Sequence, residues 1–177
     1  WNRWFGMSNL AVTSVTVTPV TSQSQQKQFI NFPWKLYAGD ANWVPPLLME
    51  HKRLLGFKHH PFYDDGAIQT FLATRGGEVV GRIAAIVNNA HNRRAEEQRG
   101  FFGFFESINK PEVASTLINK VSGVLRKEGM EIMRGPMNFS TNEECGFLSM
   151  GFDHPPILMT PYNHAYYNEL MNQCGLL

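Results

Sequence analysis

The spacing of hydrophobic positions changes its period several times along the chain, and each change marks another element. Between 12 and 20, valine alternates with threonine or serine, the period of two that predicts a half-buried strand. Four phenylalanines surround Gly103, and a glycine inside a strand indicates a bulge or a close backbone approach. In all, the pattern predicts strands at 12–20, 68–74, 78–87, 99–107 and 132–140, with a hairpin turn at 75–77.

A period between three and four predicts helices in other segments. The clearest covers 111–127, where apolar residues recur at spacings of four, four and three, and where Asn109 and Glu112 resemble a capping box. Pro33 lies inside an earlier helical pattern and predicts a kink or a break there. The sequence predicts helices from Thr21 or Ser22 onward, at 47–55, at 111–127 and at 163–173, and loops at 56–65 and 153–161.

The predicted order is strand, helix, three strands, helix, strand, helix. The central strands form a meander, whereas strand–helix–strand over 99–140 implies a right-handed parallel crossover. We therefore expect an α/β fold with a mixed, mostly antiparallel sheet flanked by helices. Residues 1–11 are expected to be an N-terminal extension, and 12–177 a single domain.

Composition narrows the class of function. Hydrophobic residues at 43% and charged residues at 18% are ordinary for a globular domain, and a net charge of +1 without a basic stripe predicts no nucleic-acid partner. No apolar run approaches the roughly 20 residues of a membrane span, and the N-terminus lacks the pattern of a signal peptide, so we expect no membrane partner. The two cysteines, Cys145 and Cys174, have no paired spacing, which favours a reducing, cytoplasmic location.

Groups that can do chemistry are concentrated after the last predicted strand. Between two glycines, the stretch 135–146 contains Asn138, Ser140, Thr141, Asn142, Glu143, Glu144 and Cys145. Solvated loops can have the same composition. The stretch is therefore a candidate site whose role depends on its neighbours.

The order of elements, together with several local phrases, resembles the GNAT superfamily of acyl-CoA-dependent N-acyltransferases, and more narrowly a largely uncharacterised bacterial GNAT-like group. The phrases are Phe32-Pro33-Trp34-Lys35-Leu36-Tyr37, Asn42-Trp43-Val44-Pro45-Pro46, Gly81-Arg82-Ile83-Ala84-Ala85-Ile86, the run 100–106, and Gly135-Pro136-Met137-Asn138-Phe139-Ser140-Thr141-Asn142-Glu143-Glu144. The resemblance covers roughly 12–175. It implies two further strands after the last helix. We therefore expect the chain to be the front part of a longer protein whose missing part completes the sheet; the alternative is completion of the sheet in a dimer.

The resemblance also implies where acetyl-CoA or another acyl-CoA would bind. In GNAT enzymes a small-residue turn at the start of a helix binds the coenzyme diphosphate through backbone amides. The corresponding turn here is 109–114, in which Ala114 fits and Glu112 replaces a glycine with a carboxylate that repels a diphosphate. The implied cofactor-binding residues are Ser107, Asn109, Lys110 and Ala114, together with Asn163, which matches an asparagine at the start of a later helix.

On the acceptor side, the resemblance implies a base that takes a proton from the amine. Glu106 closes the phenylalanine strand and is a candidate base acting through a water; the alternative is a strand-end carboxylate facing solvent. Glu143 and Glu144 are further candidates, with Asn138 orienting the substrate; the alternative is that 142–144 caps a helical turn. Ser140 is a substrate-binding candidate beside Asn138. Met171 stands where the family has its proton-donating tyrosine, and Tyr162, Tyr166 and Tyr167 on the preceding turns could substitute only with a different geometry, so Tyr162 and Tyr166 are further substrate-binding candidates.

Other reactive residues have simpler interpretations. Cys145 as a nucleophile would need His154 or His164 beside it, so a buried, small apolar role is expected instead. The pairs 59–60 and 64–65 contain two histidines and two aspartates, but without a third ligand at suitable spacing they predict a polar loop and no metal site. The phenylalanines 101–105 are expected in the core on both faces of the sheet.

Two functions of different classes follow. The first is an acyltransferase that moves an acyl group from an acyl-CoA thioester to a small-molecule amine. The second is a GNAT-like domain without catalysis, acting as a binding or structural module. A transferase that uses an aminoacyl-tRNA is a weaker third, because the nearly neutral charge gives no basic surface for RNA.

Overall fold

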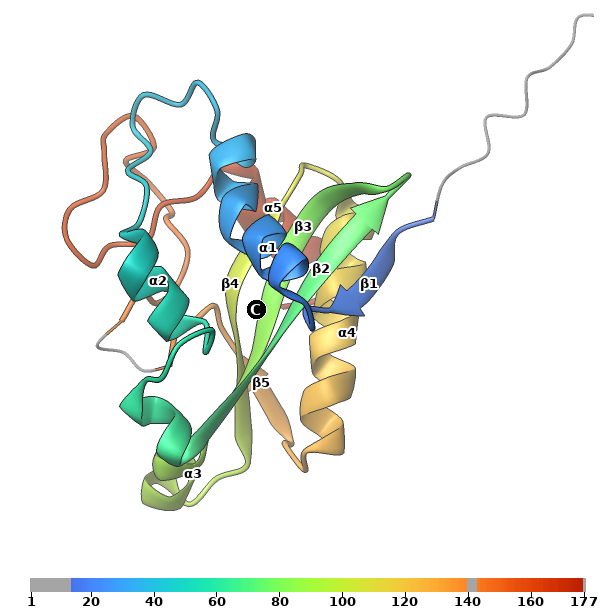
Figure 1. Cartoon of the computed structure of the whole chain (residues 1–177), viewed down its shortest axis with the longest axis vertical. Coiled ribbons are helices and arrows are strands. Elements are labelled where there is room, and N and C mark those ends of the chain that lie inside the picture. The colour runs from blue at the N-terminus through green and yellow to red at the C-terminus, as the bar shows by residue number, and fades with distance from the viewer. Residues whose placement is uncertain (1–13, 140–142, 177) are drawn as a thin grey trace, which may run out of the picture.

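The computed structural model describes residues 14–139 and 143–176. Within these ranges five strands form one sheet, whose spatial order follows the sequence from β1 to β5 (Figure 1). The first four are antiparallel neighbours, and β5 pairs parallel to β4 because α4 (Pro111–Lys127) crosses between them. The strands are β1 (Thr16–Pro19), β2 (Gly66–Arg75), β3 (Glu78–Asn88), β4 (Arg99–Ser107) and β5 (Ile132–Arg134). The predicted mixed, mostly antiparallel sheet is confirmed.

Helices cover both faces of this sheet. One apolar core lies between the sheet and the α4–α5 side, where Leu117 and Val121 of α4 and Leu170 of α5 (Tyr166–Gln173) are buried. The other core lies on the opposite face, under α1 (Gln23–Leu36) and near α2 (Leu48–Leu54). The alternation of apolar residues in β3 and β4 serves both cores, since every second side chain of a strand points to the same face.

Strand β4 contains the bulge predicted at Gly103. Arg82 of β3 pairs with Glu106 and Ala84 pairs with Gly103, so β4 has one residue more than β3 over this interval. Phe104 takes a positive φ of 51°. The extra residue places Phe102 and Phe105, three positions apart, in the same core. It therefore sets the direction of the residue that follows, Glu106.

Strands β4 and β5 part soon after they meet. Only 99–101 and 132–134 pair in register, so the strand predicted over 132–140 is shorter than expected. Beyond it, the Met137 amide donates to the Phe102 carbonyl at 2.8 Å and the Phe104 amide donates to Asn138 Oδ1 at 3.1 Å. Pro136, which has no N–H, interrupts a regular ladder here. The sheet thus opens at the level of the bulge.

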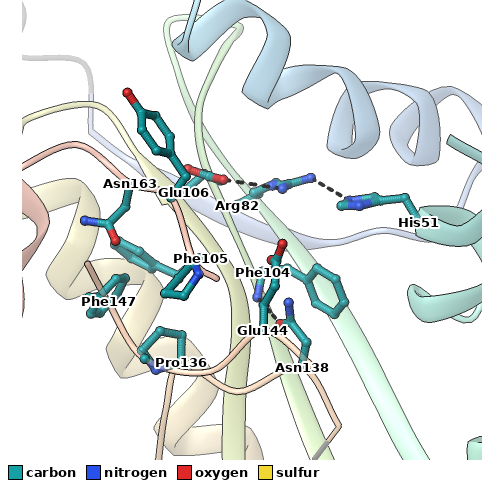
Figure 2. Close-up of a pocket in the computed structure, with 13 residues that line it drawn as sticks. His51, Arg82, Phe104, Phe105, Glu106, Pro136, Asn138, Glu144, Phe147 and Asn163 are labelled. Carbon is teal, nitrogen blue, oxygen red and sulfur yellow. Dashed lines mark hydrogen bonds and ion pairs between the residues drawn. The ribbon is translucent and has the colours of Figure 1, made fainter. Parts of the chain in front are cut away.

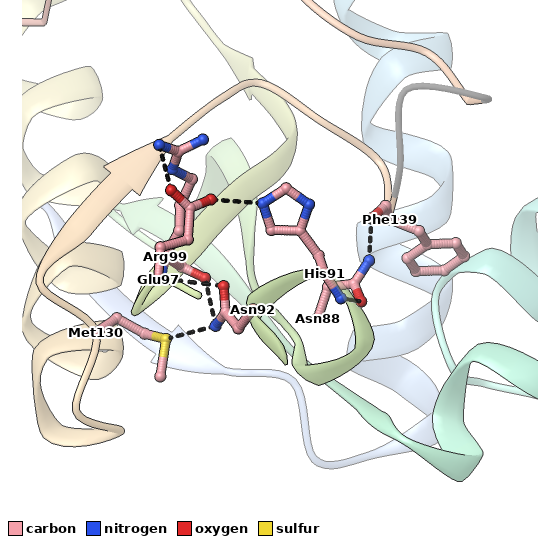
Figure 3. Close-up of polar contacts among 7 residues, drawn as sticks. All are labelled: Asn88, His91, Asn92, Glu97, Arg99, Met130 and Phe139. Atoms are coloured by element: carbon pink, nitrogen blue, oxygen red, sulfur yellow. Dashed lines mark hydrogen bonds and ion pairs between the residues drawn. The ribbon is translucent and has the colours of Figure 1, made fainter. Parts of the chain in front are cut away.

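The connection between β3 and β4 includes a short helix that the sequence did not predict, α3 (Asn89–Ala95) (Figure 3). Asn88 caps it through a bond to the backbone amide three residues on, at 2.9 Å, and its Nδ2 donates to the Phe139 carbonyl at 2.9 Å. The Asn92 amide group binds both the N–H and the C=O of Arg99. These two asparagines hold the connection against the start of β4 and the exit of β5.

Some predicted boundaries are corrected by the structure. The cap at Ser22 is confirmed as a capping box with Gln25. Of the kink or break predicted at Pro33, the break does not occur, since α1 continues to Leu36. The capping box predicted at Asn109 is wrong: Lys110 is the N-cap, without a side-chain bond. The predicted loop at 56–65 contains a 3₁₀ turn, η1 (Pro61–Asp64). In the described ranges, none of the helices has the length and apolarity needed to cross a bilayer.

The contact at the bulge gives a test of the fold. In Gly103→Ala, the new Cβ would lie 2.6 Å from Asn138 Oδ1 and 2.8 Å from the Met137 carbonyl, so we expect a loss of about 1–3 kcal/mol in unfolding free energy, measured by urea denaturation. Gly123→Ala is the matched control, because its Cβ meets nothing within 4 Å on α4 and should stabilise the protein by about 0.5–1 kcal/mol. Equal stability of both variants would contradict the close approach at Gly103.

Candidate functional site

A cavity of about 540 Å³ lies where the sheet opens. Its inner wall includes Arg82, Phe104 and Glu106, the hairpin after β5 contributes Asn138 and Glu144, and the outer walls come from the segments 43–54 and 156–162. A smaller cavity of about 70 Å³ shares Glu106, Arg82, Asn138 and Glu144 with it and is drawn in Figure 2. Residues distant in sequence therefore meet around one carboxylate.

That carboxylate belongs to Glu106, whose side chain is only 13% exposed. Its Oε2 accepts hydrogen bonds from Tyr37 Oη at 2.8 Å and Tyr167 Oη at 2.7 Å, and its Oε1 lies 3.6 Å from Arg82 Nη2. Burial raises the pKa of Glu106 above its usual range, although Arg82 and the two hydroxyl donors oppose that rise. A raised pKa makes a carboxylate a stronger base, which is the property that a general base needs.

Arg82 is the positive partner of Glu106, and its side chain is 4% exposed. Its Nη1 donates to the Phe29 carbonyl at 2.9 Å and lies 3.4 Å from His51 Nε2, while its guanidinium sits 4.9 Å from the centre of the Phe29 ring. Figure 2 shows Glu106, Arg82 and His51 in a row. An arginine keeps its charge even where burial lowers its pKa, so this site holds a permanent cation.

The Phe29 carbonyl is available to Arg82 because of Pro33. In a regular α-helix, each carbonyl accepts from the amide four residues later, and for Phe29 that residue is Pro33, which has no N–H. The helix continues past this missing bond, and the backbone amide of Tyr37 donates to the Pro33 carbonyl at 2.8 Å. The residue that the sequence marked as a helix breaker thus supplies an acceptor to a buried guanidinium.

His51 accepts from Arg82 in its neutral form. Burial, followed by the charge of Arg82, lowers the pKa of His51 to about 3. Since an arginine can only donate, the 3.4 Å contact requires an unprotonated Nε2 on His51. The ring also packs edge-on against Phe104, with 5.6 Å between centroids. α2 is thereby fixed against the inner wall of the cavity.

A second carboxylate stands at the same cavity. Glu144 is exposed at its edge, yet burial of the carboxyl and the nearby Glu106 raise its pKa, with Arg82 opposing. Glu143 lines the same cavity, and Asn138 is 9% exposed with its Oδ1 engaged by the Phe104 amide. The predicted acceptor-side residues are therefore gathered in one place, and together they favour a cationic ligand.

The residues predicted to bind the coenzyme phosphates lie outside the cavity. Ser107 is fully buried, and its hydroxyl donates to the Ile108 carbonyl at 2.8 Å. Asn109 and Lys110 are exposed, and Ala114 is buried on the inner face of α4. These residues surround the start of α4 but none lines the cavity that holds Glu106. Their role as cofactor-binding residues stays a prediction.

The start of α4 does not fit a coenzyme diphosphate in the manner of the superfamily. Glu112 binds its own backbone amide, which lowers its pKa, and Arg75 of β2 holds the same carboxylate at 2.6 Å. Pro111 offers no amide. The neighbouring amides already donate within the chain, those of Ile108, Lys110, Val113 and Ala114. An anion would have to displace Glu112 from a site that the chain has filled with its own carboxylate.

The substrate-side tyrosines anchor the outer loop. Tyr162 donates to Asp40 Oδ2 at 2.7 Å, and Tyr166 donates to the Ser107 carbonyl at 2.7 Å. Asn163 is buried and accepts from the Leu148 amide at 2.7 Å, which holds the loop that runs from the hairpin to α5. Tyr162 lines the cavity, whereas Ser140 lies outside the described residues.

Three residues around Glu106 were not identified as candidates from the sequence, Arg82, His51 and Tyr37, and Tyr167 was considered only as a substitute for the family's tyrosine. The available signal was a single arginine inside the buried strand run 79–87, because a charge in such a pattern needs a partner. The buried role predicted for Cys145 is wrong, since the thiol-bearing residue is exposed.

The histidine–aspartate loop has structural roles. His60 caps η1 by accepting from the Phe62 amide at 3.1 Å, and Asp65 forms an ion pair with Arg93. No group of three or more metal-ligating side chains occurs in 14–139 or 143–176.

Comparisons with known proteins place this geometry in context. No family model matches the chain. It is 33% identical over 172 residues to Protein YghO of Escherichia coli (strain K12), an alignment that covers 97% of this chain and 44% of that protein. It is 37% identical over 162 residues to a bacterial ceramide synthase of Caulobacter vibrioides (strain NA1000 / CB15N), covering 91% of this chain and 42% of that protein. The chain thus spans less than half the length of the curated relatives it matches.

Among solved structures, a tandem GNAT protein from the clavulanic acid biosynthesis pathway superposes with a TM-score of 0.57. The match covers 92% of this chain and 43% of that protein, at 11% sequence identity. At such low identity the similarity concerns the fold alone.

The state of His51 predicts a pH effect on stability. Its pKa of about 3 in the folded protein lies below the usual 6.5, so the unfolded chain binds a proton first and stability falls as pH drops from about 6.5 towards 3. His51→Gln keeps an acceptor for Arg82 and should lose that part of the pH dependence, measured by denaturant unfolding at a series of pH values. The exposed His59→Gln is the control and should follow the wild type; parallel curves for all three proteins would rule out a buried neutral His51.

Proposed function

We propose that this chain, which has the GNAT fold, catalyses the transfer of an acyl group to the nitrogen of an amine, with Glu106 as the general base. One observation carries the proposal: a buried carboxylate with a raised pKa stands at the inner end of a cavity, oriented by two tyrosines and an arginine. Amines are protonated at neutral pH, so a transferase must first remove a proton from its acceptor.

The reaction uses the residues in the following way. Glu106 and Glu144 attract the acceptor as its ammonium ion, and Glu106 accepts a proton from it, directly or through a water. The freed nitrogen forms a bond to the acyl carbonyl carbon while the bond from that carbon to the coenzyme A sulfur breaks, and the second proton lost by the nitrogen goes to the departing thiolate, which leaves as the thiol. Arg82, Tyr37 and Tyr167 keep the carboxylate in position throughout, because each of them binds one of its oxygens or lies beside it.

The walls of the cavity favour an acceptor with a hydrocarbon part. Carboxylates occupy its inner end, whereas Val44, Leu47 and Leu158 line its outer end and are more than half exposed. An amine bearing a hydrocarbon chain places its charge and its apolar part against matching surfaces. One relative is named a ceramide synthase, and a ceramide is the amide of a long-chain amine, which supports this acceptor class.

The proposed donor is acetyl-CoA or another acyl-CoA. The start of α4 does not offer its amides to a diphosphate, so we place the coenzyme phosphates away from that turn. The same observation favours the second candidate function, a GNAT-like module that binds an amine without catalysis. The two are separated by the following experiments.

Removal of the proposed base should abolish most of the activity. Glu106→Gln keeps both tyrosine bonds but cannot accept a proton, so we expect kcat/KM for acylation of a long-chain amine to fall by about 10²–10⁴-fold. In the wild type, kcat/KM should rise with pH through the raised pKa of Glu106, since only the ionised carboxylate acts as a base, and the variant should lack that rise. Glu78→Gln, an exposed acid on β3, is the control; activity unchanged in both variants would exclude Glu106 as the base.

Calorimetric titration with coenzyme A tests the start of α4. We expect the wild type to bind coenzyme A at millimolar ligand and Glu112→Gly to bind it more tightly, because the substitution removes a repelling carboxylate and frees its amide. No heat for the wild type would contradict acyl-CoA as the donor. Glu131→Gly, outside the helix, controls for a general effect of lost charge. Tight binding by the wild type that Glu112→Gly leaves unchanged would show that the coenzyme binds and that Glu112 does not oppose it.

A further inference from the structure

Exposed apolar side chains are concentrated in two short segments. Nine large hydrophobic residues of the described chain are exposed, and eight of them lie in 44–49 or 150–159. Leu47 and Leu158 reach 80% and 91% exposure. We call these eight the apolar rim: Val44, Leu47, Leu48, Met49, Met150, Ile157, Leu158 and Met159. The ninth, Ile132, lies on β5.

The two segments belong to one surface. Residues of both line the same cavity that contains Glu106, and Figure 1 shows α2 and the orange loop before α5 at the same side of the molecule. Two bonds join the flanks of these segments: Asn42 Nδ2 donates to the Phe152 carbonyl at 3.4 Å, and Tyr162 donates to Asp40 at 2.7 Å. The rim is therefore a built feature at the mouth of the cavity.

A surface of this kind marks a binding site, because exposed apolar patches are unfavourable in water. A folded protein partner that covered the rim would also close the cavity that leads to Glu106. A fluid lipid surface covers the rim and still lets an amphiphile enter. Lys52 and Lys58 lie in or just after α2, whose Arg53 and Glu50 form an ion pair at 3.5 Å, so the segment that carries half the rim has a net positive charge and complements an anionic surface.

We infer that the apolar rim docks onto an anionic lipid surface, with the mouth of the cavity facing the lipid. The sequence predicted no membrane partner because it contains no spanning segment, but a surface contact requires none. The contact is a property of the rim alone and holds whether or not the chain catalyses acyl transfer. For a transferase, it would deliver a lipid-borne amine with its charged end towards Glu106.

Flotation with vesicles tests this inference without any activity assay. The wild-type chain should float with phosphatidylcholine vesicles that contain phosphatidylglycerol, and less with pure phosphatidylcholine. The double variant Leu47→Asp, Leu158→Asp should partition at least about tenfold less, since it removes two apolar groups from the lipid and adds two negative charges. Ile132→Asp is the matched control, an exposed apolar residue changed in the same way outside the rim, and should float as the wild type does.

Three results would overturn the inference. One is a wild-type chain that stays with the unbound protein at every vesicle concentration. Another is equal flotation of the rim variant and the wild type. The third combines two observations: neither protein binds vesicles, and in sedimentation the wild type is a dimer whereas the rim variant is a monomer. That result would make the rim an interface between two copies of the chain. Thermal unfolding of the variants shows that each is folded, and failure of Glu106→Gln to change activity would leave this result untouched.

Discussion

The buried ion pair between Arg82 and Glu106 is the interaction on which the rest of the structure depends. Two charges removed from water need compensating partners, and leaving one of them unpaired costs about 3–5 kcal/mol. The Phe29 carbonyl of α1 and His51 of α2 contact Arg82. Tyr37, at the end of α1, and Tyr167 of α5 donate to Glu106. The packing of these elements and the state of the candidate base are therefore set by the same contacts.

This arrangement also explains why the cavity is polar at one end and apolar at the other. Glu106 and Glu144 lie where the sheet opens, because the bulge in β4 and the hairpin after β5 aim them there. The apolar rim lies on segments outside the sheet, and its side chains belong to neither core. An amphiphile matches this cavity, because its charged end can lie at the carboxylates and its hydrocarbon part can lie against the apolar rim.

Much of the fold could be predicted because its signals are local. The hairpin between β2 and β3, the bulge at Gly103 and the helix α4 follow from residues within a few positions of one another, and the resemblance to GNAT proteins is confirmed at the level of the fold. The site was predicted only in part. Glu106 was identified, but its partners Tyr37 and Tyr167 lie 69 and 61 residues away, and no spacing in the sequence points to them. The capping box predicted at Asn109 is wrong because Lys110 is the N-cap and Pro111 begins the helix, and because Glu112 forms an ion pair with Arg75 at the end of β2.

Pro33 has a consequence for any attempt to stabilise this protein. Exchanging a helical proline for alanine is a routine way to strengthen a helix, since it restores a missing backbone hydrogen bond. Here the restored amide would compete with Arg82 for the Phe29 carbonyl. In a more regular α1, the buried guanidinium would have to share that carbonyl oxygen with a backbone amide. Alanine at position 33 would favour the helix, whereas proline leaves the Phe29 carbonyl to Arg82, and the chain has proline.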